Sequence, residues 1–140
     1  MQSKLNPYLS FRNNAREAME FYRSVFGGEL VMNTFKEFQV SQDPAEDDKI
    51  MHSMIEAENG ITFMAADTPN SQAYQAGSNI SMSLSGDNEA ELRSYFEKLA
   101  AGGAVTQPLV EAPWGDSFGM CTDKFGVNWM VNVTGQRQNG

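Results

Sequence analysis

The sequence predicts an α+β protein of two βαβββ modules, whose mixed sheets curve around a shared cleft with one helix packed outside each sheet. Each half of the chain contains one amphipathic helical pattern that ends at a Gly-Gly pair, Gly27-Gly28 or Gly102-Gly103. Each half also has a glycine turn before its last strand, Asn59-Gly60 or Phe125-Gly126. Because these features recur in the same order, we interpret them as an internal repeat.

The first module covers about residues 4–67. Its expected elements are a strand over 5–11, a helix over about 15–25, and strands over 29–38, 50–57 and 61–66. Asn13 or Asn14 is placed to cap the helix. The polar, acidic and proline-broken segment 41–49 predicts a surface loop, with a mobile lid over a ligand as the alternative.

A linker over about 68–78 separates the first module from the second, which covers about 79–134, and we expect both to form a single domain. The expected elements of the second module are a strand over 79–85, a helix over about 89–101, and strands over 104–110, 117–122 and 128–133. Asp87 or Asn88 is placed to cap this helix. Residues 136–140 are expected to form a frayed tail.

The last strand has two different faces. Val127, Trp129, Val131 and Val133 alternate with Asn128, Met130 and Asn132. Asparagine is depleted in strands, so the amide-bearing face requires a reason. It is either exposed to solvent or part of a polar pocket. Trp129 belongs to the other face and is expected in the core.

Composition excludes several classes of partner. The chain has 140 residues and a net charge of -8, which argues against nucleic acid or an anionic membrane as the main partner. Its single cysteine, Cys121, excludes an internal disulfide and fits a reducing cytoplasm, where we expect the protein to be located. The apolar surroundings of Cys121 in the sequence predict a structural thiol.

Five motifs together carry a resemblance to a known family. The chain resembles the PhnB-like branch of the vicinal oxygen chelate superfamily, which also holds glyoxalase I, extradiol dioxygenases and bleomycin resistance proteins. The resemblance spans about residues 4–133 and implies the glyoxalase-like fold. Its motifs are Asn6-Pro7-Tyr8-Leu9, Glu17-Ala18-Met19-Glu20-Phe21-Tyr22, Phe26-Gly27-Gly28-Glu29, Trp114-Gly115-Asp116 and Phe125-Gly126-Val127-Asn128-Trp129.

The resemblance also implies where a metal would be held. Metal enzymes of this superfamily use His, Glu, His and Glu, and these positions fall at or next to Asn6 or Pro7, at about Met64, at Asn79 and at Met130. None of these residues is an imidazole or a carboxylate, the ligands that zinc, nickel or iron require. We therefore expect no cofactor, and the positions do not support a divalent metal.

The same mapping predicts a cleft that binds a small polar molecule without a metal. As in the bleomycin resistance proteins that the chain resembles, a homodimer would complete this cleft. Neutral hydrogen-bonding side chains combined with apolar walls are typical of ligand sites. The candidate ligand-binding residues are Asn6, Tyr8, Ser10, Met64, Asn79, Ser81, Trp114, Phe118, Asn128, Met130 and Asn132.

An enzyme of the same superfamily is the alternative. His52 is the only histidine, and it shares a strand face with Glu56, so the two form a candidate acid-base pair or part of a noncanonical metal site. Such an enzyme would be a lyase, an isomerase or an oxygenase. A structural or surface role is the simpler interpretation of a single strand histidine.

Overall fold

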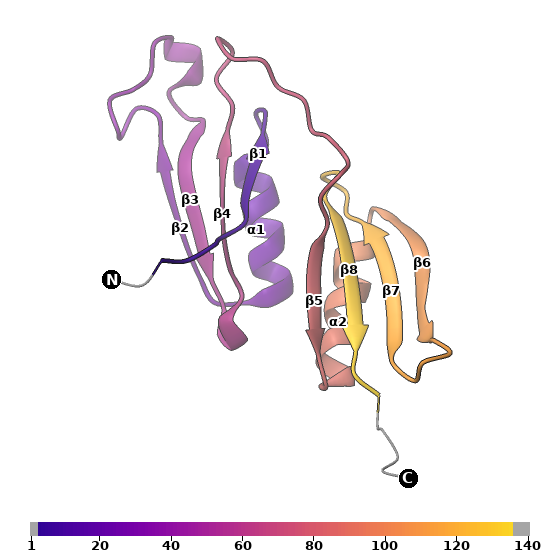
Figure 1. Ribbon diagram of the computed structural model, residues 1–140. Coiled ribbons are helices and arrows are strands. Elements are labelled where there is room, and N and C mark those ends of the chain that lie inside the picture. The colour runs from indigo at the N-terminus through magenta and orange to yellow at the C-terminus, as the bar shows by residue number, and fades with distance from the viewer. Residues whose placement is uncertain (1–2, 136–140) are drawn as a thin grey trace. The chain divides into compact units, whose positions relative to one another are not determined.

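The computed structural model describes residues 3–135 and divides into two compact units, Met1–Ala76 and Gly77–Gly140 (Figure 1). Unit one contains β1 (Tyr8–Phe11), α1 (Ala15–Phe26), β2 (Glu29–Thr34), β3 (Ile50–Glu56) and β4 (Thr62–Asp67). Unit two contains β5 (Met82–Gly86), α2 (Glu89–Ala100), β6 (Ala104–Glu111), β7 (Ser117–Thr122) and β8 (Asn128–Val133). The tail expected over 136–140 lies outside the described residues.

Each unit forms one four-stranded mixed sheet. The strand orders are β1-β4-β3-β2 and β5-β8-β7-β6, so both sheets have the same topology. In each sheet the first strand pairs in parallel with the last strand, and the remaining pairs are antiparallel. One helix covers one face of each sheet (Figure 1). The predicted α+β class with two βαβββ modules is confirmed.

In unit one, α1 and the sheet bury a shared aromatic core. Met19 and Tyr22 of α1 are fully buried, and so is Ile55 of β3. Tyr22 and Phe26 meet Phe63 of β4 edge to face, with ring centroids 5.5 and 6.1 Å apart. This geometry suits the electrostatics of aromatic pairs and fixes which face of the sheet the helix covers. The opposite face of the sheet is its open face.

In unit two, the predicted alternation of β8 is confirmed. Trp129, Val131 and Val133 are buried, whereas Asn128, Met130 and Asn132 lie on the open face and are partly exposed. Cys121 pairs with Trp129 across β7 and β8 and is 1% exposed. Burial, together with the nearby Asp123, raises the pKa of the Cys121 thiol to about 11. At neutral pH this thiol is protonated and poorly nucleophilic, as the structural role requires.

The second glycine of each Gly-Gly pair is required for the same physical reason in both units. A Cβ atom on Gly28 would clash with the carbonyl oxygen of Glu56, and one on Gly103 would clash with that of Thr122. Glu56 and Thr122 end the corresponding strands β3 and β7. The chain leaving each helix therefore passes so close to the sheet that only glycine fits.

The two helices begin differently from each other. Asn88 caps α2 as expected, since its side-chain oxygen accepts a hydrogen bond from Glu91 N at 3.1 Å. The expectation of an Asn cap on α1 was wrong, because Asn14 makes no side-chain cap bond. Asp67 at the end of β4 takes this role and accepts a bond from Ala15 N at 3.0 Å.

Three predicted strands were too long. The strand expected over 5–11 begins at Tyr8, and Leu5 is 99% exposed. The strand expected over 29–38 ends at Thr34, which exchanges two hydrogen bonds with Glu37 and turns the chain. The strand expected over 79–85 begins at Met82. Leu5 and Ile80, the apolar residues beyond two of these boundaries, are largely exposed and belong to no strand.

Candidate functional site

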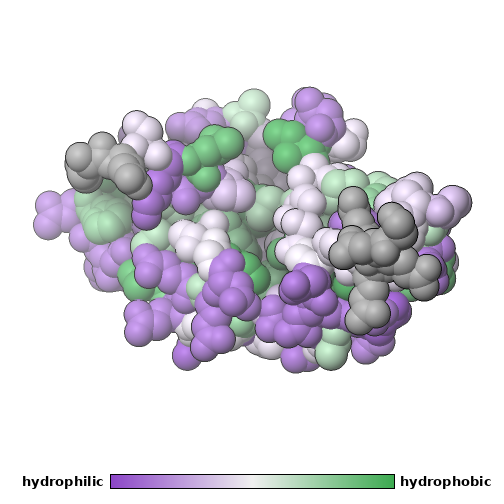
Figure 2. Space-filling model, turned by 60° about the horizontal axis from the view of Figure 1, so that its bottom comes forward, coloured by the Kyte–Doolittle hydropathy of each residue, from purple (hydrophilic) through white to green (hydrophobic). Residues whose placement is uncertain are grey.

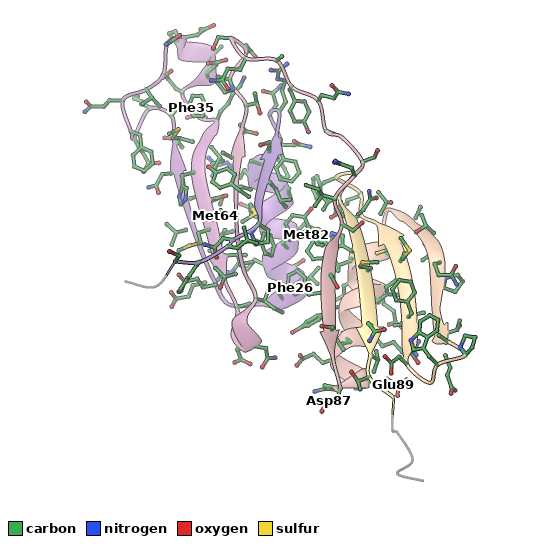
Figure 3. The ribbon with its side chains drawn as sticks, in the orientation of Figure 1. Phe26, Phe35, Met64, Met82, Asp87 and Glu89 are labelled. Carbon is green, nitrogen blue, oxygen red and sulfur yellow. The ribbon has the colours of Figure 1, made fainter. Side chains whose placement is uncertain are left out.

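A pocket of about 420 Å³ lies on the open face of unit one, referred to below as the unit-one pocket. It is formed where β1 and β4 meet the β2–β3 connection and the segment that follows β4, both at the top of this unit in Figure 1. Figure 3 shows Phe35, one of its walls, at this end of the unit. The pocket is lined by Tyr8, Ser10, Phe35, Val40, Gln42, Glu46, Met51, Ala66, Asp67, Thr68, Pro69, Ser71 and Gln72.

The floor of the pocket comes from two parallel strands. Tyr8 pairs with Met64, and Ser10 pairs with Ala66, so these four side chains share the open face. Partial burial raises the pKa of the Tyr8 phenol, which therefore remains a neutral hydroxyl at physiological pH. The ring of His52 lies 6.3 Å from that of Tyr8, centroid to centroid.

Glu46 and Lys49 join two sides of the pocket. Glu46 is buried, and its Oε1 accepts hydrogen bonds from Asn70 N at 2.7 Å and Lys49 Nζ at 3.4 Å. Lys49 Nζ also donates to Asn70 Oδ1 at 3.1 Å. These contacts hold the 41–49 loop, which contains the short 3₁₀ helix η1 (Pro44–Glu46), against the segment after β4. The lid role of this loop stays a prediction.

Arg12 holds the start of the predicted linker against β1. Its guanidinium donates to the carbonyl oxygens of Pro69, at 3.3 Å, and of Gln72. It also stacks over the Tyr74 ring at 5.6 Å, and the Tyr74 hydroxyl donates to Ser10 O at 3.3 Å. The segment after β4 is therefore a fixed wall of the pocket.

Asp67 is a lining residue that the sequence interpretation missed. It is 6% exposed, and its Oδ1 and Oδ2 accept backbone N–H bonds from Ala15 at 3.0 Å and Ile50 at 2.9 Å. The start of α1 and the start of β3 thus meet on one carboxylate. The only available signal was an acidic residue directly after the apolar strand pattern of 61–66.

In unit two, the two amides predicted to bind ligand have partners within the same unit. Asn128 Oδ1 accepts a bond from Thr122 Oγ1 at 2.7 Å, and Asn132 Nδ2 donates to Asp116 Oδ2 at 3.2 Å. Asp116 is buried and also accepts a bond from Gly135 N at 3.0 Å. This carboxylate therefore holds the β6–β7 connection against the end of β8, while Trp114 is 64% exposed.

The structure separates the candidate ligand-binding residues into groups. Tyr8 and Ser10 line the unit-one pocket, and Met64 lies beside Tyr8 in the sheet (Figure 3). A second group occupies the open face of unit two: Phe118, Asn128, Met130 and Asn132. The expectation that Asn79 and Ser81 belong to a strand was wrong, since they precede β5, as Asn6 precedes β1. The binding role of all these residues stays a prediction.

The candidate pair His52 and Glu56 lies on one face of β3, four residues apart, with Met54 between them on that face. His52 is partly buried and close to the pocket residue Tyr8. Glu56 is exposed at the end of β3, where it pairs with Glu29 and Thr62. The structure therefore places His52 nearer to the pocket than Glu56, and an acid-base role of the pair stays a prediction.

The positions that hold metal in related enzymes do not have suitable donors. In the sheets, Met64 pairs with Tyr8 and Met130 pairs with Ser83, so thioether and hydroxyl groups meet on the open faces. Such donors do not fit a divalent zinc, nickel or iron site. Within residues 3–135, no group of three or more His, Cys, Asp or Glu side chains is placed to hold a metal ion.

The surface is mainly polar in the view of Figure 2, where hydrophilic residues cover much of each unit and hydrophobic ones are scattered among them. Scattered exposed apolar residues are normal for folded proteins. In the described part of the chain, both α-helices have 12 residues, and no helix has the length and apolar character needed to cross a membrane.

Comparisons with known proteins agree with this architecture. The family model described as "Glyoxalase/Bleomycin resistance protein/Dioxygenase superfamily" matches residues 4–131. Protein YjdN of Escherichia coli is 33% identical over 144 residues, covering 95% of this chain and 97% of YjdN.

Two solved structures support the same assignment. Protein PA1353 from Pseudomonas aeruginosa is 40% identical with a TM-score of 0.79, covering 94% of this chain and 98% of PA1353. The PhnB protein from Bacillus cereus is 30% identical with a TM-score of 0.77, covering 94% of this chain and 100% of that protein. The chain therefore belongs to the Glyoxalase/Bleomycin resistance protein/Dioxygenase superfamily, as a PhnB-like member with the glyoxalase-like fold.

Proposed function

We propose that this protein binds a small polar molecule, without a metal, in a site that includes the unit-one pocket. The observation that supports this most is the composition of the pocket, where the hydroxyls of Tyr8 and Ser10 stand beside apolar walls from Phe35, Val40 and Met51. A volume of about 420 Å³ lies in the range of ligand sites, and a few aimed polar groups within apolar walls give such sites their specificity.

We propose metal-independent binding because of the donors available. The positions that correspond to the metal ligands hold Asn6 or Pro7, Met64, Asn79 and Met130 in place of imidazoles and carboxylates. Elemental analysis of protein purified without chelator and without a nickel column is expected to find metal well below one ion per chain. One equivalent of zinc, nickel, iron or manganese would contradict this part of the proposal.

We further propose that the protein is a homodimer that completes its cleft. The support is family membership, because related proteins build each cleft from paired modules, and closed two-fold dimers are the commonest assemblies of soluble proteins. Sedimentation equilibrium at micromolar concentration is expected to give twice the mass of the chain. A monomer under these conditions would contradict dimerisation but not ligand binding.

The central test is whether a larger side chain placed inside the pocket prevents the protein from retaining a bound small molecule. Ala66 lies on the pocket floor, so Ala66→Leu adds three carbon atoms to this space. Native mass spectrometry is expected to detect a small molecule co-purified with the wild type and absent from Ala66→Leu. The matched control, Ala76→Leu, makes the same change at an exposed position and is expected to retain it. Retention by Ala66→Leu would refute binding in this pocket.

A catalytic role is a second candidate because the His52 ring lies 6.3 Å from that of Tyr8, a residue that lines the pocket. An imidazole beside a neutral phenol is a reasonable general acid-base arrangement. Incubating the co-purified molecule with the wild type, His52→Gln and Glu56→Gln tests this. Conversion by the wild type that His52→Gln abolishes would favour an enzyme, whereas equal stability of the molecule in all three samples would favour a binding protein.

A further inference from the structure

We infer that the unit-one pocket accepts uncharged or positively charged small molecules and rejects phosphates, phosphonates and carboxylates. This inference rests on the proposed function, since it names the class of ligand for the same pocket. It is carried by the charges in and around the pocket walls and by the contacts that those charges already make.

The lining residues carry negative charge and no positive charge. Glu46 and Asp67 are both part of the wall, and no Lys, Arg or His is among the residues that line the pocket. The remaining polar lining groups are hydroxyls and amides from Tyr8, Ser10, Gln42, Thr68, Ser71 and Gln72. Such groups serve neutral hydroxyl, amide or amine ligands well, whereas binding sites for phosphonates and carboxylates depend on charged donors such as Arg.

The natural anion site next to the pocket is already occupied by the protein itself. A helix N-terminus offers free backbone N–H groups and a partial positive charge to an anion. At the start of α1, this place is taken by Asp67, which accepts a bond from Ala15 N at 3.0 Å. Its second oxygen accepts from Ile50 N at 2.9 Å, so an external anion would have to displace a carboxylate held at both ends.

Two cations that contact lining residues, Lys49 and Arg12, are also engaged within the protein, although Arg12 Nε is buried without a hydrogen-bond partner among the described residues. Lys49 contacts Glu46 Oε1 at 3.4 Å and Asn70 Oδ1 at 3.1 Å, and its side chain is 13% exposed. Arg12 donates to two backbone carbonyls of the segment after β4 and stacks on Tyr74. Redirecting either cation toward a ligand would break the contacts that hold the pocket wall in place.

The direction of the preference follows from Coulomb's law. Lys49 offsets Glu46, and the start of α1 offsets Asp67, so a neutral ligand meets no large charge. A bound anion meets the carboxylates of Glu46 and Asp67. Lys49 and Arg12, the cations in contact with lining residues, are already engaged within the protein. At a separation of about 6 Å and an effective dielectric constant of about 40, one like charge weakens binding roughly tenfold.

Three probes with one carbon skeleton test this preference in the full chain. Tyrosol is neutral, tyramine carries an ammonium group and 4-hydroxyphenylacetate carries a carboxylate, and the shared ring suits the aromatic walls Tyr8 and Phe35. In titrations followed by ¹H–¹⁵N chemical shifts, tyrosol and tyramine are expected to shift the pocket residues. The dissociation constant of 4-hydroxyphenylacetate is expected to be about tenfold higher. Methylphosphonate is expected to leave the pocket signals unchanged.

A charge-removing variant provides the matched comparison. Glu46→Gln keeps an acceptor oxygen for Asn70 N but removes the charge. It is expected to bind 4-hydroxyphenylacetate about threefold more tightly and tyramine about threefold more weakly, with tyrosol unchanged. Glu20→Gln makes the same change on the exposed side of α1 and is expected to leave all three affinities unchanged.

Each outcome separates the inference from the proposed function. If 4-hydroxyphenylacetate or methylphosphonate binds the wild-type pocket as tightly as tyrosol, the charge preference is refuted while small-molecule binding stands. If neither tyrosol nor tyramine shifts the pocket residues, the ligand class inferred here is refuted, whereas small-molecule binding is decided separately by native mass spectrometry of the wild type and Ala66→Leu. Because the wild-type titrations decide these points alone, the result does not depend on how Glu46→Gln folds.

Discussion

The two units share one topology but anchor their helices in different ways. In unit two, Asn88 caps α2 from the residue directly before it. In unit one, the cap comes from Asp67, which lies 52 residues along the chain from Ala15. Sheet register shows that Val133 is the equivalent of Asp67, because Phe11 pairs with Asp67 as Gly86 pairs with Val133. The two units therefore share one strand order but differ in the residue that binds the start of the helix. This residue is a neighbour in the sequence for α2 and a distant one for α1.

A second difference concerns the segments that connect the strands. Unit one has a 15-residue connection over 35–49 between β2 and β3, whereas unit two joins β6 and β7 through the five residues 112–116. The long connection and the segment after β4 supply most of the walls of the unit-one pocket. The comparison shows that the shared scaffold forms a pocket where its connecting segments are longer, which fits the general placement of function on loops.

The largest expected effect comes from removing the long-range anchor. Asp67→Ala leaves two buried backbone N–H groups without their acceptor, and we expect a loss of about 4 kcal/mol in the free energy of unfolding. Urea denaturation measures this loss. Asp48→Ala, at an exposed position of the same unit, is the control and is expected to change stability by less than about 0.5 kcal/mol. If Asp67→Ala lowered the free energy of unfolding by less than about 1 kcal/mol, Asp67 would stabilise α1 no more than Asn88 stabilises α2.

The next effect concerns the turn before the last strand. Asp123 is buried and accepts bonds from Trp129 Nε1 at 2.8 Å and from the backbone N–H groups of Phe125 and Val127. Asp123→Ala is expected to cost about 3 kcal/mol, because the buried bond from the Trp129 indole is lost, whereas the two backbone donors are only partly buried. Tryptophan fluorescence during denaturation, recorded in a Trp114→Phe background, follows the change at the Trp129 indole. Wild-type stability and an unchanged emission maximum would show that this network does not support unit two.

A smaller effect is expected for the local cap. Asn88→Ala removes the bond to Glu91 N and is expected to cost about 1 kcal/mol. Asn88→Asp keeps the acceptor and is expected to stay within about 0.5 kcal/mol of the wild type. Both are measured by urea denaturation. A loss for Asn88→Ala as large as that for Asp67→Ala would mean that the two anchors are energetically equivalent.

The last effect depends on pH. The pKa of the Cys121 thiol is raised by burial to about 11, above its ordinary value of 9.0. Between these values the unfolded chain loses the proton that the folded chain keeps, so stability falls as pH rises from about 9 to about 11. Below pH 9 this contribution is fully present. The difference in urea midpoint between wild type and Cys121→Ala is expected to narrow over this range. A difference that stays constant would contradict the claim that burial raises the pKa of the Cys121 thiol.

The sequence determined what depends on neighbouring residues. The alternation of β8, the Asn88 cap and the turn at Asn59-Gly60 are all set within a few residues, and they are found where expected. Strand ends were less predictable, because Leu5 and Ile80 continue an apolar pattern without a partner strand and are largely exposed. A strand needs hydrogen-bonding partners from elsewhere in the chain, and these are not encoded by its own pattern.

Only the tertiary structure decided which polar groups remain available. Asn128 and Asn132 look equally suited to bind a ligand in the sequence, but folding brings Thr122 and Asp116 within hydrogen-bonding distance of them. Asp67 is the opposite case. The sequence predicted no role for it, but in the structure it binds the starts of α1 and β3 and lines the pocket. These outcomes depend on contacts between different strands and connections, where burial makes each unpaired polar group costly and so selects its partner.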